Sequence, residues 1–245
     1  MIMKNVFSLT VLCILSAPCL SSEDFERAIA PRVFEFPKDF GSHPSFKTEW
    51  WYLTGALATE RGEELGFQAT WFRSGLARAL PVRESKLAAR DVFLFHGALS
   101  DVAAGRFTHD HAVCRGAANW AGAAEGKLDV FLLGRTLKRQ DDGTWRLQFS
   151  VKGRELELTL KLENEPLLHG ETTGLSLKGP GPGQASYYVS LPRLRTSGTV
   201  RREPGGKPER VSGWTWFDQE FGSNQLSDAQ TGWDWFSARL DDGAT

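Results

Sequence analysis

Residues 213–222, GWTWFDQEFG, place two carboxylates among four aromatic side chains within ten positions. A charged carboxylate is costly to bury unless it is paired or protonated, so Asp218 and Glu220 need a reason to lie here. In an extended strand, side chains alternate between the two faces. Trp214, Trp216, Asp218 and Glu220 would then share one face, which indicates an acid held against aromatic rings.

Two further segments, residues 48–52 and 232–236, also set an acid beside tryptophan, and the three segments hold six of the nine tryptophans. Burial raises the pKa of a carboxyl group, so that it can hold a proton near neutral pH and donate it. Hydration of an isolated C=C bond needs such a donor, and aromatic faces can stabilise the carbocation that forms before water attacks. The repeated pairing therefore suggests acid catalysis in an apolar pocket.

Asp218 is the first-choice proton donor, and His96, between apolar residues of a predicted strand, is a further acid, base or ligand-orienting group. The other candidate donors are Glu220, Asp234 and Glu49. The candidate ligand-binding residues are Trp51, Trp214, Trp216, Trp235, Gln68 and a phenol from Tyr187 or Tyr188. The alternative is structural: tryptophans plug the barrel ends, the acids pair with arginines such as Arg73 or Arg239, His96 is a hydrogen-bonded core residue, and the tyrosines pack.

Other chemistries find little support. The net charge is -1 and no basic block stands out, which argues against nucleic-acid binding. Residues 179–183 lack the Lys-Ser or Lys-Thr of a phosphate loop, and no Gly-x-Ser-x-Gly elbow occurs. His109, His111 and Cys114 have ligand-like spacing, but in an expected polar loop without a fourth partner. We therefore expect neither a metal nor a cofactor.

The N-terminus resembles a secretory signal. Lys4 precedes an apolar stretch, residues 6–15, that is too short to span a bilayer, and cleavage is expected near Ser21 or Ser22. No later segment is long and apolar enough for a membrane span. We expect an exported protein, periplasmic or secreted.

The cysteines bear on anchoring and on stability. Cys19 raises the alternative of a lipoprotein anchor, although Pro18 precedes it where a small residue is wanted. After cleavage Cys114 would be the only cysteine, so the mature chain cannot form an internal disulfide. Its stability must come from the core.

About ten short strands and almost no helix are expected, with turn signals between them, which is typical of an antiparallel barrel or sandwich. The expected strands are residues 47–57, 66–73, 91–101, 127–136, 145–152, 156–162, 186–191, 198–202, the tryptophan-rich 213–222, and 231–240.

Several separated motifs, in order, resemble the AttH/CrtC family over residues 34–245. They are residues 36–44, 48–52, 66–68, 96–101, 168–170, 187–188 and 213–243. The family contains lipocalin-like secreted proteins, carotenoid 1,2-hydratases (hydroxyneurosporene synthases) and members labelled predicted secreted hydrolases. The resemblance implies an all-β fold of lipocalin-like antiparallel barrels packed in a pair.

On this interpretation residues 1–22 are a signal peptide, residues 23–33 a linker and residues 34–212 the first barrel. Residues 213–245 would be linking strands and the start of an incomplete second barrel. The sequence stops at a predicted hairpin turn, Asp242-Gly243, without the return strand. The strand before the turn would then be an exposed edge. We therefore favour a fragment over a protein that has lost most of its second barrel.

The hydratases of the family typically carry an Asp-His-Asn-Trp run where this chain has Asp218-Gln219-Glu220-Phe221. Gln219 cannot exchange protons in the useful range, which argues against carotenoid hydration. Two hypotheses follow: a cofactor-free, acid-catalysed hydratase of an isoprenoid or polyene, or a carrier of a hydrophobic, lipid-like ligand. The resemblance to AttH makes an ABC-type export system a candidate partner, and the oligomeric state stays open.

Overall fold

The computed structural model describes residues 25–79, 85–224, 230–232, 234–235 and 237. One sheet of thirteen strands dominates these residues, with short helical turns at Lys38–Phe40 (η2) and Gly170–Gly174 (η3). The strands are β1 (Thr48–Thr59), β2 (Glu64–Gly75), β3 (Asp91–Asp101), β4 (Arg106–Arg115), β5 (Ala121–Ala123), β6 (Asp129–Leu132), β7 (Arg135–Arg139), β8 (Trp145–Val151), β9 (Arg154–Leu162), β10 (Leu167–Leu168), β11 (Leu175–Leu177), β12 (Ala185–Arg201) and β13 (Glu209–Gly222).

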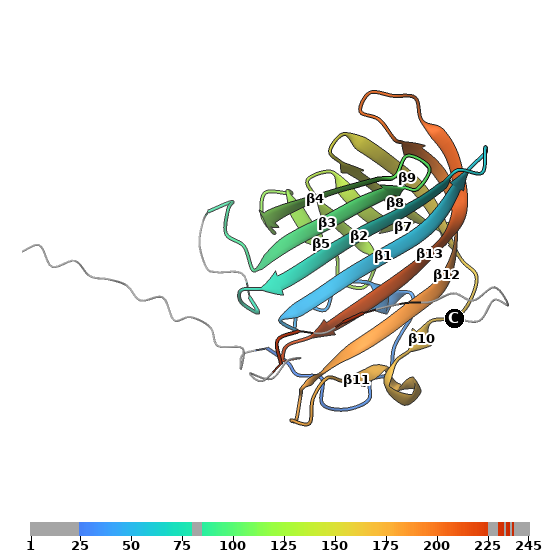
Figure 1. Ribbon diagram of the computed structural model, residues 1–245. Helices are drawn as coiled ribbons and strands as arrows, with labels where there is room; N and C mark the ends of the chain where they lie inside the picture. Colours follow the sequence, from blue (N-terminus) through green and yellow to red (C-terminus); the bar gives the residue numbers. More distant parts are fainter. Residues whose placement is uncertain (1–24, 80–84, 225–229, 233, 236, 238–245) are drawn as a thin grey trace, which may run out of the picture.

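The sheet is antiparallel throughout its strand order, β4-β3-β2-β1-β13-β12-β9-β8-β7-β6-β5, and the short strands β10 and β11 add to β12. It curls until β3 approaches both β6 and β8, giving the nearly closed barrel of Figure 1. This confirms the predicted all-β, lipocalin-like antiparallel barrel.

Two segments differ from the sequence-based expectation. The single strand expected at residues 127–136 is a hairpin, β6 and β7, because Leu133 and Gly134 adopt positive φ values of 46° and 83° and form a tight turn. The expected polar loop around His109 is strand β4, which pairs with β3 over its whole length. Polar residues at alternate positions suit the outer face of an edge strand, so the composition concealed it.

The two strands expected at residues 186–191 and 198–202 are one continuous strand, β12, of 17 residues. Its register with β13 shifts between Leu191 and Leu194, where Pro192 has no backbone N–H to donate. β12 and β13 together run through the middle of the sheet (Figure 1). The strand expected at residues 231–240 lies partly outside the described residues, and those described there are not in a strand.

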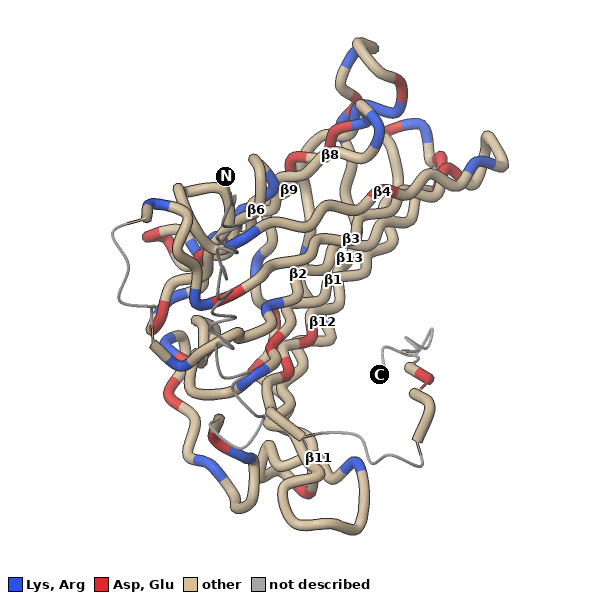
Figure 2. The backbone as a smooth tube through the Cα atoms, turned by 90° about the vertical axis from the view of Figure 1, so that its left-hand side faces the viewer, with Lys and Arg blue, Asp and Glu red and all other residues tan. Residues whose placement is uncertain are grey.

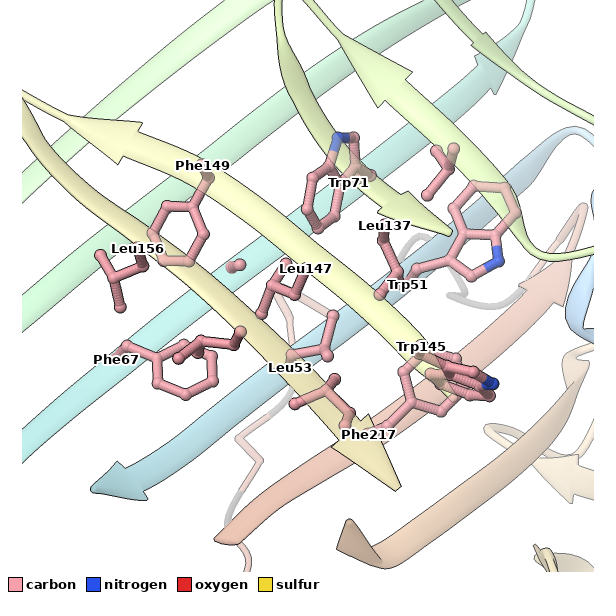
Figure 3. Close-up of a cluster of buried hydrophobic side chains, with 14 of the residues drawn as sticks. Trp51, Leu53, Phe67, Trp71, Leu137, Trp145, Leu147, Phe149, Leu156 and Phe217 are labelled. Atoms are coloured by element: carbon pink, nitrogen blue, oxygen red, sulfur yellow. The ribbon is translucent and has the colours of Figure 1, made fainter. Parts of the chain in front are cut away.

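Large apolar side chains pack inside the barrel, and Figure 3 shows part of this cluster. Trp51, Trp71 and Trp145 are each no more than 1% exposed, and the Trp51 indole donates to the Phe40 carbonyl at 3.0 Å. Side chains alone can fill a barrel of this size. The barrel interior is therefore a core, whereas the sequence analysis expected an apolar cavity, and Trp51 belongs to that core.

Charged residues of both signs are interspersed over the loops and strand ends of the described chain (Figure 2). Many of them pair with each other at the surface; Arg146, for example, contacts Glu157 at 3.0 Å, and both side chains are about half exposed. Exposed pairs of this kind contribute little to stability. The acids that could act as catalysts are therefore the few that are buried.

Candidate functional site

Glu49 is buried, but it is held in a network on the inner side of the sheet. Its Oε1 contacts His43 Nδ1 at 2.8 Å and accepts from Gln219 Nε2 at 3.1 Å. Its Oε2 accepts from the His43 backbone N–H at 2.8 Å and from Arg73 Nε at 3.3 Å. Arg73 in turn binds Asp91 at 2.9 Å. Every oxygen of Glu49 is occupied, so Glu49 is a structural residue rather than a proton donor.

The electrostatics of this network agree with its geometry. Burial alone would lower the pKa of His43, but the Glu49 charge and the hydrogen bond to Asp39 raise it above its usual value. Burial alone would raise the pKa of Glu49, but the His43 charge and hydrogen bonds lower it. Burial alone would also raise the pKa of Asp39, but the hydrogen bond from His43 helps to lower it below its usual value. His43 is therefore an imidazolium clamped between two carboxylates.

We expect this network to make stability depend on pH in a defined window. A raised His43 pKa stabilises the fold fully below about pH 6.5, and this contribution is lost as the pH rises through the folded pKa. The lowered pKa values of Glu49 and Asp39 stabilise it fully above about pH 4.5, and this is lost on acidification. The contribution therefore peaks between these limits.

The measurement is urea unfolding across pH 4–9 for the wild type and for His43→Gln. The difference in unfolding free energy should be largest near pH 5–6 and shrink towards pH 9, because only the wild type loses an imidazolium on the alkaline side. A difference that stays constant with pH would show that His43 is neutral in the folded protein.

The second group of buried acids lies on the opposite, outer face of the sheet. Tyr52 of β1 lies directly opposite Asp218 of β13, and Trp50 lies opposite Glu220. On the other side of β13, Tyr188 of β12 lies opposite Glu220. This register gathers side chains from four strands around a hollow of about 270 Å³. The hollow, here called the acid pocket, is lined by Trp50, Tyr52, Phe72, Tyr188, Asp218, Glu220 and Trp235.

Asp218 is the most distinctive group in the acid pocket, since it is 1% exposed and its Oδ2 has no hydrogen-bond partner among the described residues. Burial raises the pKa of Asp218 to about 6, against the hydrogen bond that Ser190 donates to Oδ1. The Trp216 indole and the Tyr188 phenol lie near enough to lower this pKa somewhat, although neither meets strict hydrogen-bond geometry at Oδ2. A pKa of about 6 lets a fraction of Asp218 carry a proton near neutral pH, and its Oδ2 is a buried oxygen without a hydrogen-bond partner.

Glu220 differs from Asp218 because it has a cationic partner. Lys178 Nζ lies 2.9 Å from Glu220 Oε1, the oxygen to which Ser186 also donates. Lys178 also lies over the Tyr188 ring, 5.0 Å from its centroid. The acid pocket therefore holds one carboxyl group with an oxygen that has no hydrogen-bond partner, Asp218, and one that is paired with a lysine, Glu220.

Trp235 joins the acid pocket from a segment beyond the barrel strands. Its ring packs edge-on against Tyr52 at 4.7 Å between centroids, and its indole N–H donates to the Tyr188 hydroxyl at 3.0 Å. It is 39% exposed, so it forms an outer wall. Of the residues singled out from the sequence, Asp218, Glu220, Trp235 and Tyr188 line the pocket, and Trp216 stands beside it on the same face of β13.

Four other candidates lie on the outer surface, away from the acid pocket. Trp214 lies between Arg193 and Arg195, whose guanidinium carbons are 5.1 and 4.8 Å from its ring centroid. Gln68 and His96 line a separate hollow of about 240 Å³, where burial and then His111 lower the pKa of His96. Asp234 is exposed and lines none of these hollows.

Tyr187, like Trp51 and Glu49, points away from the pocket. Its hydroxyl donates to the Ala30 carbonyl at 2.9 Å, and its ring packs against Phe46 and Phe221. Neighbouring residues of a strand face opposite sides, so Tyr188, the alternative phenol, is the one that enters the pocket.

The histidines and cysteine with ligand-like spacing do not form one cluster. His109 and His111 are exposed on one face of β4, whereas Cys114 is half-buried on the other. Among the described residues, no group of three or more His, Cys, Asp or Glu side chains is arranged to hold a metal ion.

The residues that the sequence analysis passed over are the pocket's aromatic and polar neighbours. Trp50 and Tyr52 flank Trp51, and alternation alone would have put them on the face of Asp218 once the inner face was known. His169 belongs to one of the family motifs but was given no role, and Ser190 and Lys178 carried no local signal. They reach the pocket only through the pairing of β10, β11 and β12.

A larger hollow of about 420 Å³ lies at the other end of β1, β12 and β13 and includes Thr59, Glu60 and Arg210. Its lining contains no aromatic ring and no buried acid. Volume alone does not make a reactive site, so the acid pocket is the better candidate.

The fold and the acid pocket define a lipocalin-like β-barrel protein with a buried carboxyl group on the outside of its sheet. The AttH-like family profile matches residues 27–245, and the chain belongs to this family. No sequence among the curated proteins matches the chain.

Two solved structures share the fold. A candidate AttH protein from Nitrosomonas europaea is 37% identical, with a TM-score of 0.77 over 89% of this chain and 65% of that chain. Kievitone hydratase from Nectria haematococca is 13% identical, with a TM-score of 0.56 over 81% of this chain and 55% of that one. The chain thus spans just under two thirds of the first protein and about half of the second.

Proposed function

We propose that the protein is a cofactor-free hydratase that adds water to a C=C bond of an isoprenoid or polyene, with Asp218 as the acid. The observation that carries the proposal is a carboxyl group with a pKa of about 6, a free Oδ2 and a wall of aromatic rings. A catalytic acid works best when its pKa lies near the operating pH.

The chemistry balances within the pocket. Protonated Asp218 gives its proton to one alkene carbon, and a carbocation forms at the other. The faces of Trp50, Tyr52 and Trp235 and the carboxylate of Glu220 surround it with negative potential. Water then adds to the cation, and the resulting oxonium returns one proton to the Asp218 carboxylate. The acid is regenerated and one water has been added.

The replacement of the family hydratases' histidine by Gln219 argues less strongly against hydration than the sequence suggested. Gln219 points to the inner side, where its Nε2 donates to Gly41 O at 3.0 Å and to Glu49 at 3.1 Å. A residue next to Asp218 on the strand faces away from the acid pocket, so a histidine there would not reach the ligand of Asp218. The change that does face the pocket is Glu220, at the position of the family's asparagine, and Lys178 pairs with it.

The pocket suits one end of an apolar molecule. Its volume of about 270 Å³ is at the lower limit of typical ligand sites, which begin at about 300 Å³. Five of its seven lining residues are aromatic, which favours an apolar chain end with a reactive double bond. Kievitone hydratase shares only the fold with this chain. The proposal therefore rests on the residues of the acid pocket and not on that similarity.

The test is incubation with an acyclic carotenoid in isotopically labelled water, followed by mass spectrometry of released ligand. A product that carries one added, labelled water supports the hydratase. Ligand that binds and returns unchanged would overturn catalysis and favour the alternative, a carrier of a hydrophobic molecule, which the aromatic lining also suits. The absence of binding by the folded protein would count against both.

We further propose export, with an ABC-type export system as partner, from the signal-like N-terminus and the AttH-like family. Residues 1–24 lie outside the described residues, and no helix in the described part of the chain is long and apolar enough to cross a membrane. Cell fractionation with N-terminal sequencing would test this. A new N-terminus near Ser21 or Ser22 in the exported fraction supports cleavage, whereas labelled lipid on Cys19 would support the anchored alternative.

A further inference from the structure

His169 reaches Asp218 through one serine hydroxyl, which the proposed mechanism does not use. His169 Nε2 lies 2.7 Å from Ser190 Oγ, and Ser190 donates its hydroxyl hydrogen to Asp218 Oδ1. Ser190 has a single hydrogen to give. If Ser190 donates that hydrogen to Asp218, the His169 nitrogen that faces Ser190 must carry its own hydrogen and donate it to the Ser190 oxygen.

The fold holds His169 firmly in this place. β10 pairs with β12, and the His169 backbone N–H donates to the Tyr188 carbonyl at 3.1 Å. The imidazole stacks on the Tyr188 ring at 3.9 Å between centroids and 19° between planes. Gly170 then turns the chain at φ 70°, where a Cβ atom would lie 1.9 Å from Leu175 O. The ring can neither swing away nor be displaced cheaply.

The charged surroundings keep His169 neutral. Burial first, and then the nearby positive charge of Lys178, lower the pKa of His169. Lys178 itself is paired with Glu220, and among the described residues the other titratable groups that face His169, Ser190 and Asp218 are the phenols of Tyr188 and Tyr52. Burial raises the pKa of both phenols, so they stay protonated near neutral pH. A neutral imidazole has one N–H, so the tautomer of His169 decides the direction of the two hydrogen bonds from His169 through Ser190 to Asp218.

We propose that His169 is a positioning residue: its Nε2–H directs the hydroxyl hydrogen of Ser190 onto Asp218 and so determines the pH at which Asp218 gains its proton. This proposal deepens the proposed hydratase and rests on it for its functional meaning. A hydrogen bond to the ionised form of an acid stabilises that form. His169 and Ser190 therefore moderate the effect of burial and keep Asp218 a usable acid.

The first test needs no substrate. ¹⁵N spectra of the histidine rings at pH 7–8 should show neutral His169 protonated at Nε2, with its resonances assigned by loss in His169→Gln. A neutral ring protonated at Nδ1 would overturn the proposal, because Nε2 would then accept the Ser190 hydrogen and leave none for Asp218.

The second test follows the Asp218 carboxyl through a pH titration by ¹³C NMR, with the signal assigned by its loss in Asp218→Asn. Ser190→Ala and His169→Phe should each raise its proton affinity about tenfold, the size expected for one charge-assisted hydrogen bond. His169→Gln should stay near the wild type, since the glutamine amide can donate in place of Nε2. The double variant should match Ser190→Ala alone, because both act through one hydrogen.

These outcomes separate the two proposals. If His169→Phe leaves the Asp218 titration unchanged, the positioning role is overturned, whatever the activity. If the titration shifts as expected and no variant hydrates a carotenoid, the positioning role stands and the hydratase fails. If both the positioning role and the hydratase are correct, the alkaline limb of the pH–rate profile should move to higher pH in His169→Phe and Ser190→Ala, with KM unchanged. Should either variant fail to fold, the ¹⁵N spectrum of the wild type still decides.

Discussion

Replacing Asp218 by Asn is expected to lower the rate of hydration by about 10²- to 10⁴-fold, the contribution typical of a positioned general acid. Asparagine has nearly the same shape and can still accept from Ser190, but it has no proton to transfer at neutral pH. KM should change little, because the aromatic walls remain. Turnover by mass spectrometry at substrate saturation measures the effect.

Asp218→Asn should also make the protein more stable at pH 7. An acid whose folded pKa is raised stabilises the fold fully below its unfolded pKa, near 4, and this contribution is lost as the pH rises through about 6. Holding Asp218 ionised at pH 7 therefore costs up to about 3 kcal/mol, which the neutral amide would avoid. A lower rate together with a higher melting temperature is the signature of a site that trades stability for function.

Asp234→Asn is the matched control, because Asp234 is the other acid beside Trp235 but is exposed and outside the pocket. It should leave both rate and melting temperature near the wild type. If Asp218→Asn keeps full activity, Asp218 is removed from the mechanism. If it loses activity and also unfolds more easily, its role in the pocket is structural.

Replacing Arg73 by Leu is expected to destabilise the protein by about 3–5 kcal/mol, the usual result of removing one member of a buried ion pair. Arg73 is 2% exposed and binds Glu49, Asp91 and the carbonyls of His43 and Phe46. Its loss would leave His43 as the remaining charged partner of Glu49 and Arg90 as that of Asp91, and the two carbonyls would lose their donor. The measurement is urea unfolding at pH 6, inside the window in which His43, Glu49 and Asp39 stabilise the fold.

Arg146→Leu is the matched control. Arg146 pairs with Glu157 at 3.0 Å, but both side chains are about half exposed, at 55% and 48%. An exposed pair of this kind contributes below about 1 kcal/mol. Equal losses for Arg73→Leu and Arg146→Leu would contradict the structural role assigned to the buried network.

The alternation of residues 213–222 could be read without a structure. The strand places Asp218 and Glu220 on one face and Phe217 and Gln219 on the other, as their pairing with β1 shows. Short apolar runs and turn signals were likewise enough to predict an antiparallel barrel or sandwich, and the resemblance to the AttH/CrtC family implied the barrel. Both are local properties, because side-chain direction in a strand follows from residue spacing alone.

Which face is the inside could not be read locally, and most of the misplaced candidates follow from this. Assuming a cavity within the barrel favoured Trp51, Glu49 and Tyr187, which the structure places in the core or in its polar network. Closure of the sheet is a long-range event that depends on how β3 approaches β8. Only then does the inner face fill with side chains, which leaves Asp218 and Glu220 on the outer face.

The sequence by itself determined the fold class, the acid–aromatic pairing and the choice of Asp218 as the first candidate. Only the tertiary structure decided that Asp218 lies outside the barrel, that Glu49 is neutralised by His43 and Arg73, and that Ser190 and His169 stand behind Asp218. The physical reason is that burial, charge pairing and hydrogen-bond direction depend on strands far apart in the chain, which strand register brings together.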